Sequence, residues 1–309
     1  MISIVVPLYN TQDCVVPLYT RLCTSFENSN AMIELIFVDD YSPQQDYKVV
    51  HEIAKQDPRV KLVKLSRNFG QQAAISCGLK HAIGEWVIVM DADLQDRPEE
   101  IPRLYSKALE GYDIVFTRVG HRRDSFLKRL FSNVFHTMFA YFTGARGNHG
   151  IRNFGIYSRK VVDAFLSLDE QFRGFALLVR WLGFKSDVIE VQHDRREIGK
   201  TSYNFTKGLN LAMDSFLTFS DKPLRITIMS GFVVSLISFM AGLVFLFRAL
   251  LGYTVILGWT SLILSIWFLS GFTVFCVGLI GLYVGKVFNE TKKRPHYIVD
   301  YTINIDEEV

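Results

Sequence analysis

Residues 86–100, WVIVMDADLQDRPEE, change from an apolar run to a group of acids within a few positions. The apolar run that starts at Trp86 has the length and composition of a buried strand. Asp91, Asp93 and Gln95 follow at intervals of two residues. Alternate side chains of an extended strand point to the same face, so these three are expected to converge. The stretch therefore predicts a buried strand that ends in a set of oxygen ligands.

Similar β-rich runs occur on both sides of this stretch. They are ISIVVP from Ile2, IELIFV from Ile33, VKLVKL from Val60 and DIVFT from Asp113. Helix-compatible stretches lie between them, such as 71–82 and 98–109. Strands and helices that alternate at this spacing indicate βαβ units and a mostly parallel, Rossmann-like sheet. Pro98 suits the first turn of a helix, and Asp96 suits the cap before it.

Polar residues follow the carboxyl end of every predicted strand. They are Tyr9 and Asn10, Asp39 and Asp40, Ser66, Arg67 and Asn68, Asp91 and Asp93, and Arg118. Open α/β sheets bind ligands in the crevice beyond the carboxyl ends of their strands. The sequence therefore predicts one site at this edge of the sheet.

Asp91 and Asp93 suit a hard divalent cation. Mg²⁺ commonly takes one or two carboxylates and completes its shell with water and substrate phosphates. Gln95 can add a neutral oxygen. The other interpretation is an acidic cluster that caps a helix, which accounts for Asp96 but not for Asp91.

The chain has no P-loop, no Gly-x-Gly-x-x-Gly, no nucleophile elbow and no His-Glu-x-x-His. A phosphate ligand would therefore need a metal ion and basic side chains. The candidates are Arg67, Arg118, Arg195, Arg196 and Lys200. Gly199 suits a turn that closes the segment 195–205, RREIGKTSYNF, over phosphates, although each of these bases could also be an ordinary surface charge.

The last third of the chain differs in composition. Residues 226–247 carry no charge, and after Arg248 no charge recurs before Lys286, which leaves 261–283 as a second apolar span. Helices of this length cross a ~30 Å hydrocarbon core, although a pair of buried core helices is the alternative. Basic residues flank the outer ends of the two runs: Lys222, Arg225, Lys286, Lys292, Lys293 and Arg294. The positive-inside rule then places both termini in the cytoplasm.

Two further segments, about 126–142 and 205–219, have apolar residues at helical spacing. We interpret them as helices in the membrane interface, with ordinary core helices as the alternative. The opening MISIVVPLYN has no basic region typical of a signal peptide. Four cysteines without paired spacing predict neither a disulfide nor a metal site, and a net charge of +3 does not indicate a nucleic-acid partner.

These motifs together resemble family 2 glycosyltransferases with the GT-A fold. Within that family the chain is similar to polyprenyl-phosphate glycosyltransferases, namely the dolichyl-phosphate mannose synthases and the bacterial GtrB and ArnC types. The resemblance rests on VVPLYN, FVDDYS, SRNFGQQAA joined to DADLQD, RNFGIYSRKVVDAF and REIGKTSYNF, which occur in order along nearly the whole chain.

The resemblance implies roles for individual residues. A nucleotide-sugar site would comprise Pro7, Tyr9, Asn10, Asp39, Asp40, Arg67 and Gln71. Mg²⁺ or Mn²⁺ would lie among Asp91, Asp93 and Gln95 and bridge the diphosphate. The catalytic set would be Asp91, Asp93, Arg118, Arg196 and Lys200, with the three basic residues on phosphates.

The chain departs from the family pattern at two positions. Thr11 stands where a glutamate is usual, and Asn153 stands where relatives often have an aspartate considered as a base. An amide cannot act as a base. A phosphate monoester has its second pKa near 6 and is mostly dianionic at neutral pH, so a phosphate acceptor needs no protein base.

The resemblance thus implies a membrane enzyme with three parts. Residues 1–222 would form the cytoplasmic catalytic domain, 223–285 a two-helix transmembrane hairpin, and 286–309 a cytoplasmic tail. The enzyme would be a metal-dependent hexosyltransferase of the inner membrane that moves one sugar, with inversion, from a nucleotide sugar to undecaprenyl phosphate. UDP-glucose is the first candidate donor, the product would serve cell-envelope or O-antigen modification, and a homo-oligomer such as a tetramer is compatible with the resemblance.

Two alternatives remain open. Residues 177–181, LLVRW, resemble the Arg-Trp end of the Gln-x-x-Arg-Trp motif of processive polysaccharide synthases, but Leu177 replaces the glutamine. A non-catalytic, membrane-anchored nucleotide-binding partner is the second alternative.

Overall fold

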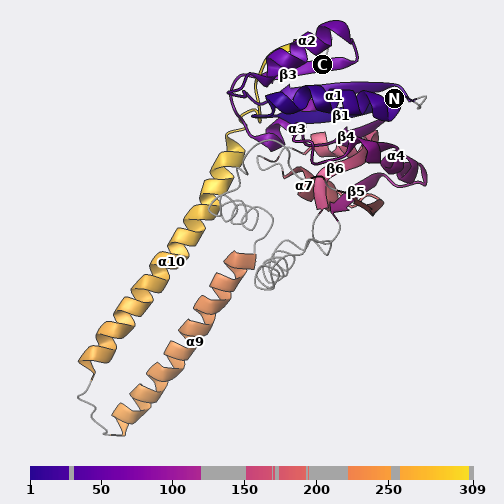
Figure 1. Ribbon diagram of the computed structural model, residues 1–309. Helices are drawn as coiled ribbons and strands as arrows, with labels where there is room; N and C mark the ends of the chain where they lie inside the picture. Colours follow the sequence, from indigo (N-terminus) through magenta and orange to yellow (C-terminus); the bar gives the residue numbers. More distant parts are fainter. Residues whose placement is uncertain are drawn as a thin grey trace. The chain divides into compact units, whose positions relative to one another are not determined.

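The computed structural model describes residues 1–27, 31–119, 151–168, 170, 174–192, 194, 222–251 and 258–305. Their largest element is an eight-stranded sheet in the order β7-β5-β6-β4-β1-β2-β3-β8 (Figure 1). The strands β1 (Ile2–Leu8), β2 (Ile33–Asp39), β3 (Val60–Leu65), β4 (Trp86–Val89), β5 (Ile114–Val119) and β7 (Ser186–Val191) all run in one direction. β6 (Ile151–Ser158) and β8 (Val299–Ile303) run the opposite way. The predicted mostly parallel sheet is confirmed.

Helices cover both faces of this sheet. One layer contains α1 (Gln12–Phe26), α2 (Asp46–Gln56), the short 3₁₀ helix η1 (Pro98–Glu100) and α4 (Ile101–Leu109). The other contains α3 (Gln71–His81), α6 (Arg159–Leu166) and α7 (Phe175–Trp181). Because both faces are covered, β1 and β2 are buried along their whole length, which explains their unbroken apolar sequences.

The helix α3 packs very closely on the middle of the sheet. A Cβ atom on Gly78 would lie 2.3 Å from Cγ1 of Val5, so only glycine permits this approach. Gly78 lies in the second half of α3, so this close approach holds the helix, which begins at Gln71, against β1 and β2.

The five predicted strands and the helices predicted at 71–82 and 98–109 are found within one or two residues of their expected bounds. β4 ends at Val89, so Asp91, Asp93 and Gln95 lie in the loop after the strand and not on the strand itself. The stretch predicted as one helix at 98–109 begins with the 3₁₀ turn η1 and becomes α-helical at Ile101. The antiparallel strands β6 and β8 and the parallel strand β7 were not expected. β8 pairs with β3, so the C-terminal stretch that was expected to be a separate tail contributes an edge strand to the sheet.

The chain also contains two long apolar helices, α9 (Lys222–Leu250) and α10 (Trp259–Thr291), which contact each other side by side (Figure 1). They belong to a compact unit distinct from the sheet and its helices. Among the described residues, one helical stretch is long and apolar enough to cross a membrane, Ser265–Thr291. It extends beyond the expected end of the second span at Tyr283. For the first predicted span, the described part of α9 offers a shorter apolar stretch, Leu224–Val234.

Candidate active site at the carboxyl edge of the sheet

The loops after β1 and β2 are joined by a buried carboxylate. Asp46, at the start of α2, is fully buried and accepts hydrogen bonds from the Thr11 main-chain N–H (2.8 Å) and hydroxyl (2.9 Å). Its other oxygen accepts from the Ser42 hydroxyl at 2.7 Å, and Ser42 in turn accepts from the N–H of Asn10 at 3.0 Å. Thr11, to which the sequence assigned no role, therefore helps to hold the first loop of the site. Sequence reasoning missed Asp46 because an acid at the start of a helix has an ordinary local explanation.

Asp39 lies at the end of β2 with an unsatisfied oxygen. The side chain is 0 % exposed, and its Oδ1 accepts a long hydrogen bond from the Ser42 N–H at 3.4 Å. Among the described residues, Oδ2 has no hydrogen-bond partner. Burial raises the pKa of Asp39 to about 7. A buried carboxylate oxygen of this kind is suited to a ligand that donates a hydrogen bond.

Two other predicted nucleotide-binding residues lie close to Asp39 along the first strand. Pro7 is buried inside β1 and pairs in register with Val38 of β2. Tyr9 follows the strand and is 46 % exposed. The structure thus places Tyr9, but not the side chain of Pro7, at the open surface of this edge.

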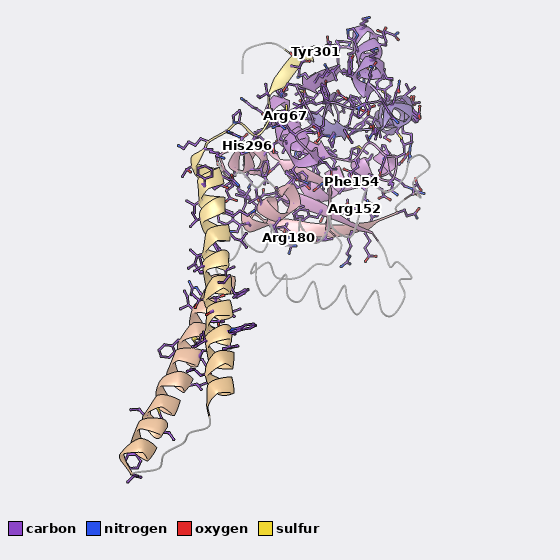
Figure 2. The ribbon with its side chains drawn as sticks, turned by 90° about the vertical axis from the view of Figure 1, so that its left-hand side faces the viewer. Arg67, Arg152, Phe154, Arg180, His296 and Tyr301 are labelled. Carbon is purple, nitrogen blue, oxygen red and sulfur yellow. The ribbon has the colours of Figure 1, made fainter. Side chains whose placement is uncertain are left out.

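Asp40 holds the loop that follows β3. Its two oxygens accept hydrogen bonds from the main-chain N–H groups of Phe69 (2.7 Å) and Gly70 (2.8 Å). Gly70 has φ +94°, a conformation that favours glycine, and α3 starts at the next residue. Arg67 is exposed (Figure 2). Its guanidinium lies over the ring of Phe69, 4.3 Å from the ring centre. Asp40 therefore positions this loop through its backbone, and both of its oxygens are engaged.

Asp91 and Gln71 meet at the same edge. Gln71 Nε2 donates to Oδ1 of Asp91 at 2.7 Å, which links the first residue of α3 to the loop after β4. Asp93 is nearly buried, and its Oδ1 accepts from the main-chain N–H of Gln95 at 3.3 Å. The structure therefore brings Gln71, assigned by resemblance to the nucleotide-sugar site, into contact with the loop 91–97, called the acidic loop below.

Asp96 does not cap the following helix, so that prediction is wrong. No side chain caps η1, and Oδ2 of Asp96 instead accepts from the main-chain N–H of Asp91 at 3.2 Å. Its Oδ1 lies 3.7 Å from Nη1 of Arg152, near the start of β6 (Figure 2). Burial and then the Asp91 carboxylate raise the pKa of Asp96 to about 7. Asp96 therefore folds the acidic loop back on itself.

Arg152 is a site residue that sequence reasoning missed. β6 runs antiparallel to its neighbours, so its first residues reach the edge where the parallel strands end. The sequence signal for the strand that carries Arg152 is RNFGIYS, residues 152–158, which follows a long stretch without a clear strand pattern. Its direction in the sheet was not predictable from that local pattern.

The predicted phosphate ligands are only partly described. Arg118 is half-buried at the end of β5 and donates to Oε1 of Glu190 on β7 at 2.7 Å. An ion pair between partly exposed side chains contributes little to stability. Arg196 and Lys200 lie outside the described residues, as do the predicted interface helices at 126–142 and 205–219.

The donor set of the acidic loop fits a cation such as Mg²⁺. Asp91, Asp93 and Gln95 offer hard oxygen atoms, which Mg²⁺ and Mn²⁺ prefer. Within the described ranges, no group of three or more His, Cys, Asp or Glu side chains forms a complete metal cage. An incomplete protein shell is what Mg²⁺ uses when substrate phosphates supply its remaining ligands.

Comparison with known proteins identifies the family. The model of "Glycosyl transferase family 2" matches residues 3–166, more than half of the chain. The chain belongs to glycosyl transferase family 2. The match spans β1 to α6 and includes the described candidate site residues. Glu190, the ion-pair partner of Arg118, lies outside it.

Relatives of this family 2 glycosyltransferase match it over almost its whole length. An undecaprenyl-phosphate 4-deoxy-4-formamido-L-arabinose transferase of Proteus mirabilis is 33% identical over 98% of this chain and 94% of its own length. A prophage bactoprenol glucosyl transferase homologue of Escherichia coli is 32% identical over 96% of this chain and 98% of its own length. Mannosyl-3-phosphoglycerate synthase from Rubrobacter xylanophilus is a structural neighbour with a TM-score of 0.51, 15% identity and coverage of 73% and 74% of the two chains. This last likeness supports a GT-A-like fold.

Proposed function

We propose that this glycosyltransferase moves a single sugar from a nucleotide sugar to the phosphate of undecaprenyl phosphate. The observation that carries the proposal is the full-length similarity to two transferases whose names share this acceptor and differ in the sugar. Since undecaprenyl and bactoprenol phosphate are the same class of lipid, the acceptor is the common element. The sugar varies between them, and UDP-glucose is the first donor to test.

The nucleotide would bind at the end of β2. The unsatisfied Oδ2 of Asp39 can accept a hydrogen bond from an N–H of the base or a hydroxyl of the ribose once the groups that cover it move aside, because the side chain is 0 % exposed. Tyr9, Asn10 and Arg67 are exposed around this point and would contact the nucleotide. Asp40 and Asp46 would hold the two loops in place, because their oxygens are engaged with the protein.

The acidic loop would hold Mg²⁺ or Mn²⁺ through Asp91, Asp93 and Gln95. When bound, the cation would neutralise the charge that develops on the departing nucleoside diphosphate. Gln71 would fix the Asp91 carboxylate through its 2.7 Å hydrogen bond. Arg118, Arg196 and Lys200 would contribute positive charge to the phosphates of donor or acceptor.

The acceptor phosphate would itself be the nucleophile. One of its oxygens forms the new bond to the anomeric carbon, and the bond between that carbon and the donor diphosphate breaks on the opposite side, so the configuration inverts. The dianion carries no proton to be removed, which agrees with an asparagine at position 153. The protein would align the two substrates and supply positive charge that stabilises the departing diphosphate.

The two apolar helices would anchor the enzyme in the inner membrane. We assign the spans to 226–247 and 261–283, with both termini in the cytoplasm according to the basic flanks. This arrangement would place the transfer at the membrane surface, where the lipid phosphate lies. The interface helices predicted at 126–142 and 205–219 would serve the same purpose.

The test uses full-length protein in vesicles that contain undecaprenyl phosphate, with labelled UDP-glucose and other nucleotide sugars. The expected result is label in the lipid extract, one sugar per lipid, that is lost when EDTA is added. A long polymer would favour the processive synthase, and tight nucleotide binding without any transfer would favour the non-catalytic partner. Trp181, 65 % exposed at the end of α7, is the feature of LLVRW that an elongating sugar chain could stack on.

Substitution of one ligand tests the metal assignment. The Asp93→Asn variant should fold normally and lose metal-dependent transfer, because the amide cannot supply the negative charge. The melting temperature checks folding and the lipid extract checks transfer. Turnover close to that of the unsubstituted enzyme would rule out Asp93 as a cation ligand.

A further inference from the structure

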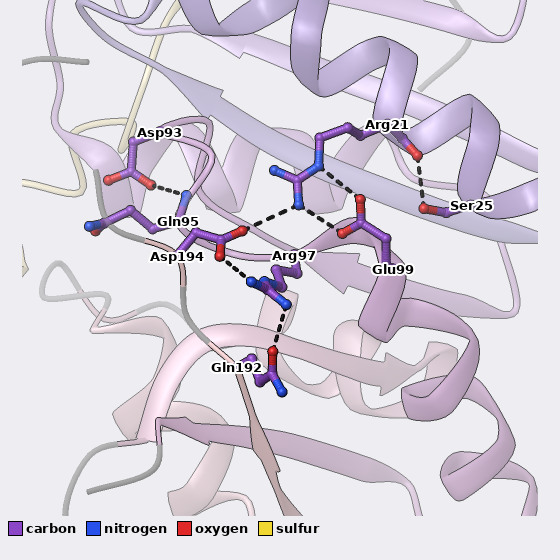
Figure 3. Close-up of polar contacts among 8 residues, drawn as sticks. All are labelled: Arg21, Ser25, Asp93, Gln95, Arg97, Glu99, Gln192 and Asp194. Carbon is purple, nitrogen blue, oxygen red and sulfur yellow. Dashed lines mark hydrogen bonds and ion pairs between the residues drawn. The ribbon is translucent and has the colours of Figure 1, made fainter. Parts of the chain in front are cut away.

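The residues after β7 lie against the acidic loop (Figure 3). Arg97, which directly follows Asp96, donates from Nη1 to Oε1 of Gln192 at 2.7 Å. Its Nη2 forms an ion pair and hydrogen bond with Oδ1 of Asp194. These contacts join parts of the chain that are 95 and 97 residues apart.

A main-chain contact extends this connection to the proposed cation ligands. The N–H of Asp194 donates to the carbonyl oxygen of Gln95 at 3.1 Å. The N–H of Gln95 in turn donates to Oδ1 of Asp93 at 3.3 Å. A single residue, Gln95, thus connects Asp194 to Asp93 through its two backbone groups.

The acidic loop has a backbone conformation that needs support. Leu94, between Asp93 and Gln95, has φ +61° and is buried. A non-glycine residue in the left-handed region is held there at a cost of about 1–2 kcal/mol and persists where neighbouring groups determine it. The contacts from Asp194 to the carbonyl of Gln95 and to Arg97 restrain the loop from outside, directly after this residue.

A second guanidinium group, that of Arg21, also contacts Asp194. Its Oδ2 lies 3.5 Å from Nη2 of Arg21 on α1, and Arg21 also donates two hydrogen bonds of 2.8 Å to Glu99 (Figure 3). The two oxygens of Asp194 therefore face two different guanidinium groups. The Asp194 carboxylate thus connects α1, through Arg21, to the acidic loop, through Arg97.

We propose that Asp194 is a positioning residue for the cation site, which holds Gln95 and, through it, Asp93 in the arrangement that binds the metal. The inference rests on the proposed function, because it concerns the same acidic loop. Partners that orient metal ligands typically contribute a factor of about 10–100 in metal affinity or activity. The expected effect of losing Asp194 is therefore a roughly tenfold weaker affinity for the cation.

The variants are Asp194→Ala and Asp194→Glu. Asp194→Ala keeps the main-chain N–H that faces the Gln95 carbonyl but removes the carboxylate contacts with Arg97 and Arg21 that hold this residue in place. Asp194→Glu keeps the charge on a longer side chain. The matched control is Asp187→Ala, because Asp187 lies on β7 and pairs with Lys107 at 3.2 Å, away from the acidic loop. Mn²⁺ binding to full-length protein with UDP present is measured from the electron paramagnetic resonance signal of free Mn²⁺. Hydrogen exchange of the peptide that covers 91–97, measured without metal, reports on the loop directly.

The Asp194→Ala variant should bind Mn²⁺ roughly tenfold more weakly and exchange faster at 91–97, with partial recovery in Asp194→Glu and no change in the control. If Asp194→Ala does not fold, Asp194→Asn, which removes the charge but keeps two polar atoms, is measured in its place. Unchanged Mn²⁺ binding and unchanged exchange would overturn the positioning role alone. Failure of the unsubstituted protein to bind Mn²⁺ would overturn the proposed cation site and this inference with it.

Discussion

The Asp39→Asn substitution should change how stability depends on pH. Asp39 is 0 % exposed, and burial raises its pKa from the ordinary 3.8 to about 7. The folded protein therefore keeps a proton that the unfolded chain releases between pH 4 and 7. Since the folded state binds more protons in this range, the contribution of Asp39 to stability falls as the pH rises through it and is constant above about pH 7.

The magnitude follows from the shift. One pKa unit corresponds to about 1.4 kcal/mol, so the difference between 3.8 and about 7 is worth roughly 4 kcal/mol in total. About 3 kcal/mol of this stability is lost as the pH rises from 5 to 8. Asparagine has no charge to bury, so the variant should gain stability relative to the unsubstituted enzyme as the pH rises. The gain corresponds to a difference in Tm on the order of 5–10 °C.

Thermal melting of the full-length protein in detergent, at several values between pH 5 and 8, measures this difference. Glu110→Gln is the control, because Glu110 is an exposed acid that pairs with Lys107. Its Tm should differ from that of the unsubstituted enzyme by the same small amount at every pH. A constant difference for Asp39→Asn across the range would refute the reasoning that burial keeps Asp39 protonated in the folded state up to about pH 7.

Three further substitutions test the packing around the site. Asp46→Ala should lower the free energy of unfolding by about 3 kcal/mol, because one buried and two part-buried donors lose their acceptor, and denaturant unfolding measures this. Gly78→Ala should destabilise by about 1–3 kcal/mol through overlap with the sheet, whereas Gly271→Ala in α10, where nothing lies within 4 Å, should be tolerated; melting temperatures compare the two. Arg118→Ala should change stability by less than about 1 kcal/mol, since its partner Glu190 is exposed, but should raise KM for the donor or acceptor in steady-state kinetics. An unchanged KM for both substrates would remove Arg118 from the phosphate site.

The parallel strands β1 to β5 could be predicted from sequence because their signals are local. Strands buried on both faces are apolar throughout, and turn residues separate them from helices at a regular spacing. The carboxyl-edge site followed from the same pattern, since polar residues end each of these strands. β6, β7 and β8 could not be predicted in this way, because their positions depend on pairing with strands distant in the sequence.

The roles of single acids in the site were harder to predict. Asp96 precedes a proline-initiated turn, so its local sequence resembles a helix cap, yet its partners are the N–H of Asp91 and the distant Arg152. Asp40 resembles a ligand but holds two backbone N–H groups of the loop after β3. In both cases the decisive partner is a group that the surrounding sequence does not contain.

The central claim is that the sugar becomes joined to the phosphate of a polyprenyl phosphate. The most direct test is the structure of the lipid product that purified full-length enzyme forms from UDP-glucose and undecaprenyl phosphate with Mg²⁺. The account predicts, by mass spectrometry and NMR, one hexose linked through its anomeric carbon to the lipid phosphate, with the configuration inverted relative to the donor. A product with retained configuration, a sugar attached elsewhere than the phosphate, or a polymer would contradict it.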